Sequence, residues 1–313
     1  MKICVVFTGG TIASRTNGTV VELGNAPYAL LEGVDIEGVD FVTAEPYSIL
    51  SEELTAERLC ALSDCIKKNI TDCEAVIVTH GTDSLVYTAA FLSYVFADTR
   101  VPIYLVSSGY PLDDSRANGR ENFSAAVNCA VKKTHAGGVY IAWAWTAAGE
   151  TRFCPGVRSV RQRPYDDLVE WVAGDEDYAP PYPVPAFAAE PKGFGSVYYI
   201  KELPSVSYPP LGRETAAVII ESYHSGTLCA GERFAAFMKT ADELGIPVFI
   251  TGTGGRDADY ETVGKYKALG AVPLAKASPD AMYVKLCLVT AFRGDKESIV
   301  KLMTAPSAGD MAE

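Results

Sequence analysis

Residues 1–13 are Met-Lys-Ile-Cys-Val-Val-Phe-Thr-Gly-Gly-Thr-Ile-Ala, and they are the most informative part of the chain. The apolar run from Ile3 to Phe7 has the length and composition of a buried strand. It ends at Thr8, and two glycines then lead to Thr11. The glycines let backbone N–H groups approach a ligand closely. We therefore expect the hydroxyl of Thr11 to lie in a ligand site at the carboxyl edge of a sheet.

A second segment of the same kind occupies residues 75–84. It begins with an apolar run that indicates another buried strand and ends with Thr79-His80-Gly81-Thr82-Asp83-Ser84. Two strand ends that each present a threonine beside glycine suggest one active site built from two loops. Each segment also has a simpler explanation. Thr11 is a residue type that caps turns, and Thr82 and Asp83 are favoured at the start of the helix expected after them.

Both segments resemble the bacterial-type L-asparaginase family, whose motifs are Thr-Gly-Gly-Thr-Ile and His-Gly-Thr-Asp. The order of the two motifs, one strand-helix unit apart, makes the pair specific. Two further segments are similar to the family more weakly. Ser51 precedes Leu54-Thr55 as the family's substrate-binding serine precedes Met-Thr or Met-Asn. Residues 116–122 correspond to another family segment, although Asn118 replaces its aspartate. Past residue 140 only the layout is similar. The chain is therefore identified as a divergent member of this family.

The resemblance implies a role for each site residue. Thr11 is the nucleophile, Thr82 belongs to the activating triad, and Asp83 holds the α-amino group of the substrate. Ser51 and Glu52 contact the α-carboxylate and amino end of the substrate. The expected substrate-binding residues are Gly10, Ser51, Glu52 and Gly81. From residue types alone, Ser51 and Glu52 favour a helix start with a capping role.

One departure from the family concerns the lysine of its catalytic triad. In the family, this lysine lies in the loop that follows the strand corresponding to Val139–Trp143 of this chain. No lysine occurs between Lys133 and Lys192. Arg158 and Arg161 are the candidates near its place. An arginine keeps its charge and cannot relay a proton as a lysine can. It can still hold Asp83 or a substrate carboxylate as a bidentate partner.

A second departure concerns the loop after Thr11, where the family brings a tyrosine over the site. Here Thr19 lies near that place, and Tyr28 is the closest tyrosine. The two threonine motifs of the family are therefore present, while the family's triad lysine and active-site tyrosine are not evident in the sequence.

The histidines are candidates of a different kind. His80 precedes Gly81, and a hydrogen-bonded histidine at a strand end explains it better than a general base does. His224 lies at the end of an expected strand in the second half of the chain. Members of the family carry glycine and asparagine in this loop. Thr227 lies near the place of that asparagine. A plain surface loop explains His224 equally well. If subunits pair as in the family, the residues that approach the partner's site are His224, Ser225, Thr227 and Glu261, in a homodimer or homotetramer.

Strands and helices alternate along the chain, which predicts an α/β fold with a parallel sheet flanked by helices. We expect a larger N-terminal domain over residues 1–177, a Pro-rich linker over 178–195 and a smaller C-terminal α/β domain over 196–313. The tail from Thr304 is polar and small, and is expected to fray.

Composition narrows the function class. The net charge of -12 argues against a nucleic-acid partner, because no basic surplus exists to displace counterions. No apolar run approaches membrane-spanning length, and no secretory signal is visible. Eight cysteines without a Cys-x-x-Cys pair are typical of free thiols in a reducing cytoplasm, and three histidines argue against a zinc cluster. We expect a cytoplasmic protein with no metal or organic cofactor.

Three functional hypotheses follow. The leading one is hydrolysis of L-asparagine, or a related small side-chain amide, through a threonyl acyl-enzyme. The alternative is a catalytically impaired asparaginase-like protein that binds an amino acid or amide. The third is the amidase subunit of a tRNA-dependent amidotransferase, which the absence of an added N-terminal domain and the acidic charge oppose.

Overall fold

The larger sheet carries both threonine segments. The computed structural model describes residues 1–17, 20–23, 30–32, 36–144, 150–164, 166, 168–172, 178–253 and 260–312. The sheet has six strands in the order β4-β1-β5-β6-β7-β8. They are β1 (Lys2–Phe7), β4 (Asp40–Ala44), β5 (Ala75–Thr79), β6 (Ile103–Val106), β7 (Val139–Ala144) and β8 (Thr151–Pro155). Only β7 and β8 pair in antiparallel fashion, so the expected mainly parallel α/β sheet is confirmed.

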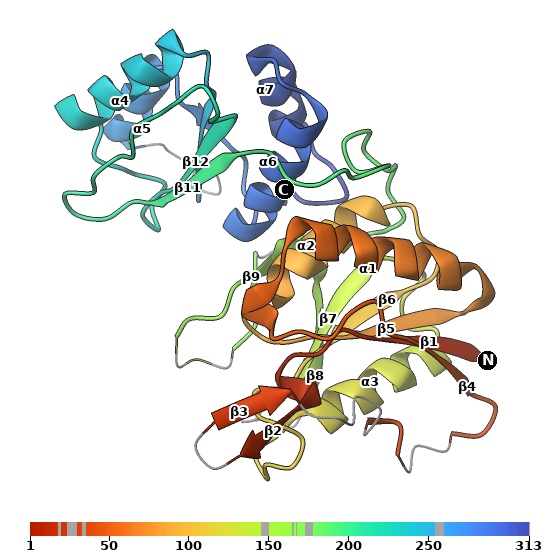
Figure 1. Cartoon of the computed structure of the whole chain (residues 1–313). Helices are drawn as coiled ribbons and strands as arrows, with labels where there is room; N and C mark the ends of the chain where they lie inside the picture. The colour runs from red at the N-terminus through yellow and green to blue at the C-terminus, as the bar shows by residue number, and fades with distance from the viewer. Residues whose placement is uncertain are drawn as a thin grey trace.

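Helices cover both faces of this sheet (Figure 1). One face carries α1 (Ala56–Asn69) and α2 (Leu85–Val95), and the other carries α3 (Gly119–Val131). Neighbouring strand residues therefore enter different cores: Val78 packs with α2, and Ile77 packs with α3. Strands buried on both faces appear in the sequence as continuous apolar runs, which explains why β1 and β5 were predictable.

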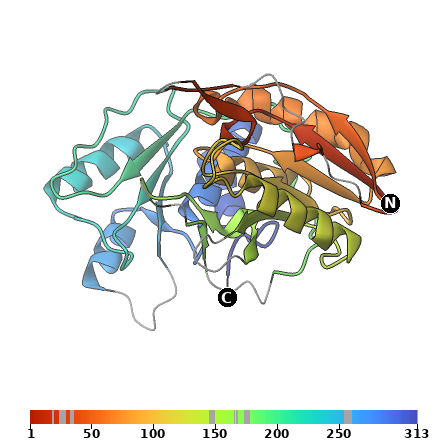
Figure 2. The same ribbon diagram turned by 90° about the horizontal axis from the view of Figure 1, so that it is seen from below.

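A second, parallel sheet of four strands follows in the order β11-β12-β13-β14. Its strands are β11 (Val197–Lys201), β12 (Ala217–Glu221), β13 (Val248–Thr251) and β14 (Val272–Pro273). The helices α4 (Glu232–Glu243) and α5 (Glu261–Ala268) pack on it through a separate core that includes Phe234 and Tyr266. Figure 2 shows this block beside the larger one.

Two further helices follow: α6 (Pro279–Phe292) lies between the smaller sheet and α2, and α7 (Lys296–Thr304) packs on α6 (Figure 1). Side chains of α2, α6, α7 and the smaller sheet share one continuous core. Residues 178–195 form no helix or strand, yet Phe187 and Ala188 are buried. The division into domains at residues 178–195 stays a prediction.

The C-terminal tail contradicts the expectation that it frays from Thr304. Asp310 is fully buried, and its carboxylate accepts a hydrogen bond from Lys285 Nζ at 2.8 Å. The hydroxyl of Tyr94 donates to the same carboxylate at 3.1 Å, and Arg158 Nε donates to the carbonyl of Gly309 at 2.8 Å. These contacts bind the tail to α2 and α6. The expectation was wrong because the partners of Asp310 are remote in the sequence.

Short elements complete the fold. Two hairpins are formed by β2 (Ser14–Asn17) with β3 (Val20–Leu23) and by β9 (Ser159–Val160) with β10 (Glu170–Trp171). The 3-10 helices are η1 (Thr11–Ala13), η3 (Ser51–Glu53), η4 (Ile70–Asp72) and η5 (Gly156–Arg158).

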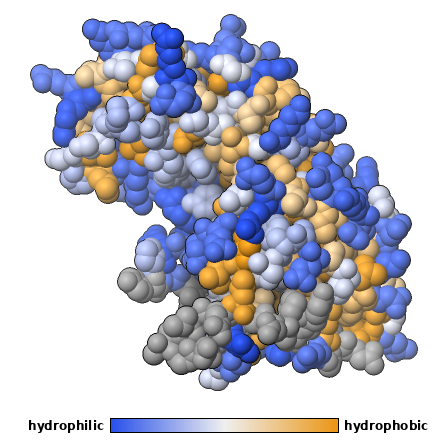
Figure 3. All heavy atoms as spheres, in the orientation of Figure 1, coloured by the Kyte–Doolittle hydropathy of each residue, from blue (hydrophilic) through white to orange (hydrophobic). Residues whose placement is uncertain are grey.

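One face of the molecule is mostly polar where its residues are described. Hydrophilic side chains cover most of the face in Figure 3, and apolar side chains gather there only in small patches. Among the described residues, no helix combines the length and apolarity needed to cross a bilayer.

Candidate active site

The first threonine segment continues the sheet beyond the end of β1. Gly9 pairs in parallel with Ile49, whose N–H donates to the carbonyl of Thr8 at 3.1 Å and whose carbonyl accepts from Gly10 N–H at 2.8 Å. Gly9 and Gly10 have φ values of 95° and 79°. This left-handed conformation strains residues that carry a Cβ. The turn that presents Thr11 therefore requires these glycines.

The two threonine segments meet backbone to backbone. A Cβ added to Gly10 would lie 2.2 Å from the nitrogen of Gly81, and a Cβ added to Gly81 would lie 2.5 Å from Cβ and Oγ of Ser51. Such distances leave no room for any side chain at either glycine. Since Thr11 and Thr82 directly follow these glycines, both threonines leave the backbone from adjacent points.

Ser51 connects to the second segment through its side chain and its backbone. Its Oγ accepts from Asp83 N–H at 3.3 Å and donates to Asp83 Oδ2 at 3.4 Å. Its carbonyl accepts a hydrogen bond of 2.6 Å from the Ser84 hydroxyl. Ser51 is buried, whereas Asp83 and Glu52 are exposed. Ser51 therefore holds the carboxylate of Asp83 at the surface, where it can meet a ligand.

The helix that follows, α2, begins without a side-chain cap. Ser84 occupies the N-cap position of α2, but its side chain makes no capping hydrogen bond, since its hydroxyl is used on Ser51. Uncapped first-turn N–H groups favour an anion such as a carboxylate. The contact of Ser84 with Ser51 was not predicted from the sequence, because the two residues are 33 positions apart.

His80 is buried among neutral partners. Its Nδ1 lies 2.8 Å from the carbonyl of Gly81, so Nδ1 must carry the proton and donate it. Its Nε2 then accepts from the hydroxyl of Thr88 at 2.9 Å. Burial lowers the pKa of His80 to about 4, partly offset by the bond to Gly81. The imidazole is therefore neutral at pH 7 and orients the Gly81 turn, in accord with its explanation as a hydrogen-bonded strand-end histidine.

Two buried asparagines, the N-cap residue Asn118 of α3 and Asn122 within α3, lie at the same edge of the sheet. Asn122 donates to the carbonyl of Ser107 at 2.8 Å and accepts from Ala144 N–H. Asn118, which stands where the family has aspartate, accepts from Gly109 N–H at 3.0 Å. Both residues satisfy backbone groups, just beyond β6 and at the end of β7, so their role is to hold the chain around the site.

The two arginines proposed near the missing lysine serve other contacts. Arg158 is buried, with its guanidinium 5.7 Å from the ring centre of Tyr178 and its Nε bonded to Gly309. Arg161 forms ion pairs with Asp280 and Glu221, both at 2.5 Å. Their guanidinium groups thus anchor the C-terminal half of the chain. Thr19 and Tyr28, the other candidates over the site, lie outside the described residues.

The remaining candidates lie on the smaller sheet. In the loop after β12, Ser225 Oγ is 3.2 Å from Nε2 of His224. This loop is closed by a hydrogen bond of 2.9 Å from Tyr223 N–H to the carbonyl of Thr227. His224 is exposed and Thr227 is half-buried. Glu261, at the start of α5, pairs with Lys265 at 2.9 Å. This group belongs to a different sheet from Thr11 and Thr82.

Three well-formed hollows in the described surface lie away from Thr11 and Thr82. One of about 240 Å³ is lined by Glu202, Tyr208 and their neighbours, and one of about 400 Å³ lies between Phe187 and Phe292. The candidate site is defined instead by the backbone contact between Gly10 and Gly81.

Comparison with known proteins gives one consistent result. The family model described as asparaginase, N-terminal, matches residues 2–152. The L-asparaginase of Thermococcus kodakarensis is 26% identical over 333 residues, which cover 99% of this chain and 99% of that protein. A glutamyl-tRNA(Gln) amidotransferase component from Thermoplasma acidophilum is 33% identical over 133 residues, which cover 41% of this chain and 32% of that protein.

The solved structure of the thermostable L-asparaginase from Thermococcus kodakarensis shares the fold. It superposes with a TM-score of 0.78 at 21% identity and covers 100% of both chains. The family model and the full-length similarity to an L-asparaginase support the class of protein, an asparaginase-type amidohydrolase. Residues 2–152 match the N-terminal asparaginase family model, and over its full length the chain is similar to an L-asparaginase.

Proposed function

We propose that this protein hydrolyses L-asparagine, or a related small side-chain amide, to the corresponding acid and ammonia. The observation that supports the proposal is the close contact of Gly10 with Gly81, the residues that directly precede Thr11 and Thr82. The full-length similarity to an L-asparaginase supports the same activity.

The proposed reaction proceeds through an ester of Thr11. Its Oγ attacks the carbonyl carbon of the side-chain amide, and the hydroxyl proton leaves through Thr82. The carbon–nitrogen bond then breaks, the nitrogen takes up a proton, and ammonia departs. Water hydrolyses the ester and restores the hydroxyl of Thr11. An amide needs such an activated nucleophile because it is a poor electrophile.

The neighbouring groups bind the amino-acid end of the substrate. The carboxylate of Asp83 pairs with the α-ammonium group, and Ser51 fixes that carboxylate. First-turn N–H groups of α2 are suited to a substrate anion. The neutral imidazole of His80 adds no charge to the site.

The assembly is part of the proposal. We infer a cytoplasmic homodimer or homotetramer in which the loop with His224, Ser225 and Thr227 approaches the partner's threonines. Support comes from the place of this loop, directly after the carboxyl end of β12, where ligand-binding residues of α/β proteins gather.

A second candidate function rests on the missing lysine. Arg158 and Arg161 are both used in structural contacts, so the described residues offer no clear replacement for it. An asparaginase-like protein that binds an amino acid or amide without turning it over would fit this observation.

Ammonia release from L-asparagine and L-glutamine by the purified protein separates the two functions. We expect measurable release by the wild type and none above background by Thr11→Ala. Thr43→Ala, an exposed threonine on β4, is the matched control and should retain wild-type release. Tight binding of L-asparagine without ammonia release by the wild type would establish the second function instead.

A further inference from the structure

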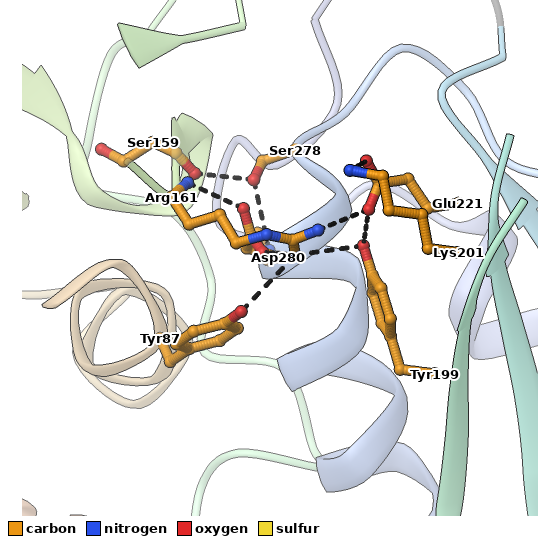
Figure 4. A network of polar contacts seen from close by, with 9 residues as sticks. Tyr87, Ser159, Arg161, Tyr199, Lys201, Glu221, Ser278 and Asp280 are labelled. Atoms are coloured by element: carbon orange, nitrogen blue, oxygen red, sulfur yellow. Dashed lines mark hydrogen bonds and ion pairs between the residues drawn. The ribbon is translucent and has the colours of Figure 1, made fainter. Parts of the chain in front are cut away.

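Arg161 lies at a junction of elements that are distant in the sequence (Figure 4). It follows β9, and its guanidinium points between α2, α6 and the smaller sheet. Its acidic partners are Asp280 on α6 and Glu221 at the end of β12. Its phenolic partners are Tyr87 on α2 and Tyr199 on β11.

Asp280 fixes Arg161 on the N-terminus of α6. The backbone N–H of Arg161 donates to Asp280 Oδ2 at 2.9 Å, and Nη1 donates to Oδ1 at 2.5 Å. Ser278 adds a hydrogen bond of 2.6 Å to the carbonyl of Ser159. The side chain of Asp280 is only 1% exposed. A buried carboxylate in this position depends on its cationic partner.

One branch of the junction leads toward the threonine site. Nη1 of Arg161 lies 3.5 Å from the hydroxyl of Tyr87. Tyr87 follows Asp83 by four residues, about one turn of helix, in the first turn of α2. The position of Arg161 is thus coupled to the helix start that carries Thr82 and Asp83.

The other branch leads toward the His224 loop. Nη2 of Arg161 bonds to Glu221 Oε2 at 2.5 Å, and the hydroxyl of Tyr199 donates to the same oxygen at 2.5 Å. Lys201 lies 3.4 Å from the other carboxylate oxygen. Glu221 ends β12 and precedes His224 by three residues. Arg161 therefore joins two segments that each lead directly into candidate site residues.

The shape of the guanidinium explains why an arginine occupies this place. Its planar fork presents separate N–H groups in fixed directions, so one side chain can bind two carboxylates and two phenols at once. A lysine ammonium is a compact point charge and cannot reproduce those directions.

We propose that Arg161 is a positioning residue that fixes the loop of His224 and Thr227 relative to the helix start of Thr82 and Asp83. The inference rests on the proposed function. In the proposed assembly, this loop completes the active site of the partner subunit. Displacement of the loop relative to the helix start would therefore lower activity at every site of the oligomer.

Kinetic comparison of Arg161→Met, Arg161→Lys and Glu221→Gln with the wild type tests the role. We expect Arg161→Met to lower kcat/KM by about tenfold to a hundredfold, as misplacement of remote groups does. Arg161→Lys should recover only part of the loss, and Glu221→Gln should lose activity without disturbing Asp280. Arg163→Met is the control, because Arg163 is 76% exposed and pairs with Glu170 at 3.6 Å.

Hydrogen exchange supplies a readout that does not need activity. In Arg161→Met, amide exchange should accelerate both in residues 82–88 and in residues 222–228. In Arg163→Met, exchange in both segments should remain as in the wild type. Acceleration in only one segment, or wild-type kinetics in a folded Arg161→Met, would overturn the inference. Absence of ammonia release by the wild type would refute the proposed function alone, since the exchange pattern still decides whether Arg161 couples the two segments.

Discussion

The backbone of Gly10 lies directly against the backbone of Gly81, so that a Cβ on Gly10 would come within 2.2 Å of the Gly81 nitrogen. This contact links the end of β1 to the end of β5, neighbours in the larger sheet. It explains why each threonine is preceded by glycine. The candidate site is thus created by close backbone packing between two loops.

Substitution of either glycine should damage both stability and activity. Gly10→Ala combines a left-handed φ of 79° with a backbone collision, and Gly81→Ala places a methyl group on Ser51. We expect each to lower the free energy of unfolding by about 1–3 kcal/mol and to lower ammonia release more than stability explains. Gly264→Ala on α5, which has no atom within 4 Å of its added Cβ, is the control and should keep both. Urea unfolding and ammonia assays measure the two effects.

The neutral state of His80 predicts a specific pH dependence of stability. Its pKa falls from 6.5 to about 4 on folding. Between these values the unfolded chain binds more protons, so stability must fall as the pH is lowered from 6.5 to 4. The pKa difference corresponds to about 3 kcal/mol. Urea unfolding of wild type and His80→Gln at several pH values should show a shallower pH dependence in the variant. Equal slopes would show that His80 titrates normally in the folded protein.

The buried ion pair of the C-terminal tail should be sensitive to the loss of one partner. Burial lowers the pKa of the Lys285 ammonium, although Asp310 opposes this shift. Lys285→Met leaves the Asp310 carboxylate unpaired in the interior, so we expect a loss of about 3–5 kcal/mol in unfolding free energy. Lys296→Met removes an exposed ion pair with Asp242 and should cost under about 1 kcal/mol. Similar losses in the two variants, measured by urea unfolding, would contradict the role of the tail.

The missing lysine predicts slow turnover. Loss of general-base assistance costs about 10²–10⁴-fold in rate, and Arg158 and Arg161 are held in other contacts. We expect kcat on L-asparagine well below about 10 per second, the median for enzymes. Steady-state ammonia release measures it. A value at or above that median would mean that the site activates Thr11 without a lysine.

The central part of the fold was predictable because its strands are buried on both faces. The expected strands Ile3–Phe7 and Ala75–Thr79 lie in β1 and β5, and alternation with helices indicated a parallel sheet. The expectation that Thr11 and Thr82 leave one sheet edge followed from the same pattern. Local sequence carries this information because glycine and buried apolar runs act over a few residues.

Features set by distant partners were not predictable in the same way. Arg161 and Asp280 are 119 residues apart, and Arg161 and Glu221 are 60 apart. From the sequence, Arg161 was expected near the place of the missing lysine, whereas in the fold it joins α2 and α6 to the smaller sheet. The tail was misjudged for the same reason, since Asp310 is polar in sequence but is neutralised by Lys285 in the interior.

Mass spectrometry of protein quenched in acid during turnover of L-asparagine can detect the ester of Thr11 itself. We expect a fraction of the wild-type protein to be heavier by one aspartyl group, with the added mass on the peptide that contains Thr11, and no such fraction in Thr11→Ala. Ammonia release without an adduct in the wild type, and undiminished in Thr11→Ala, would show that Thr11 is not the nucleophile.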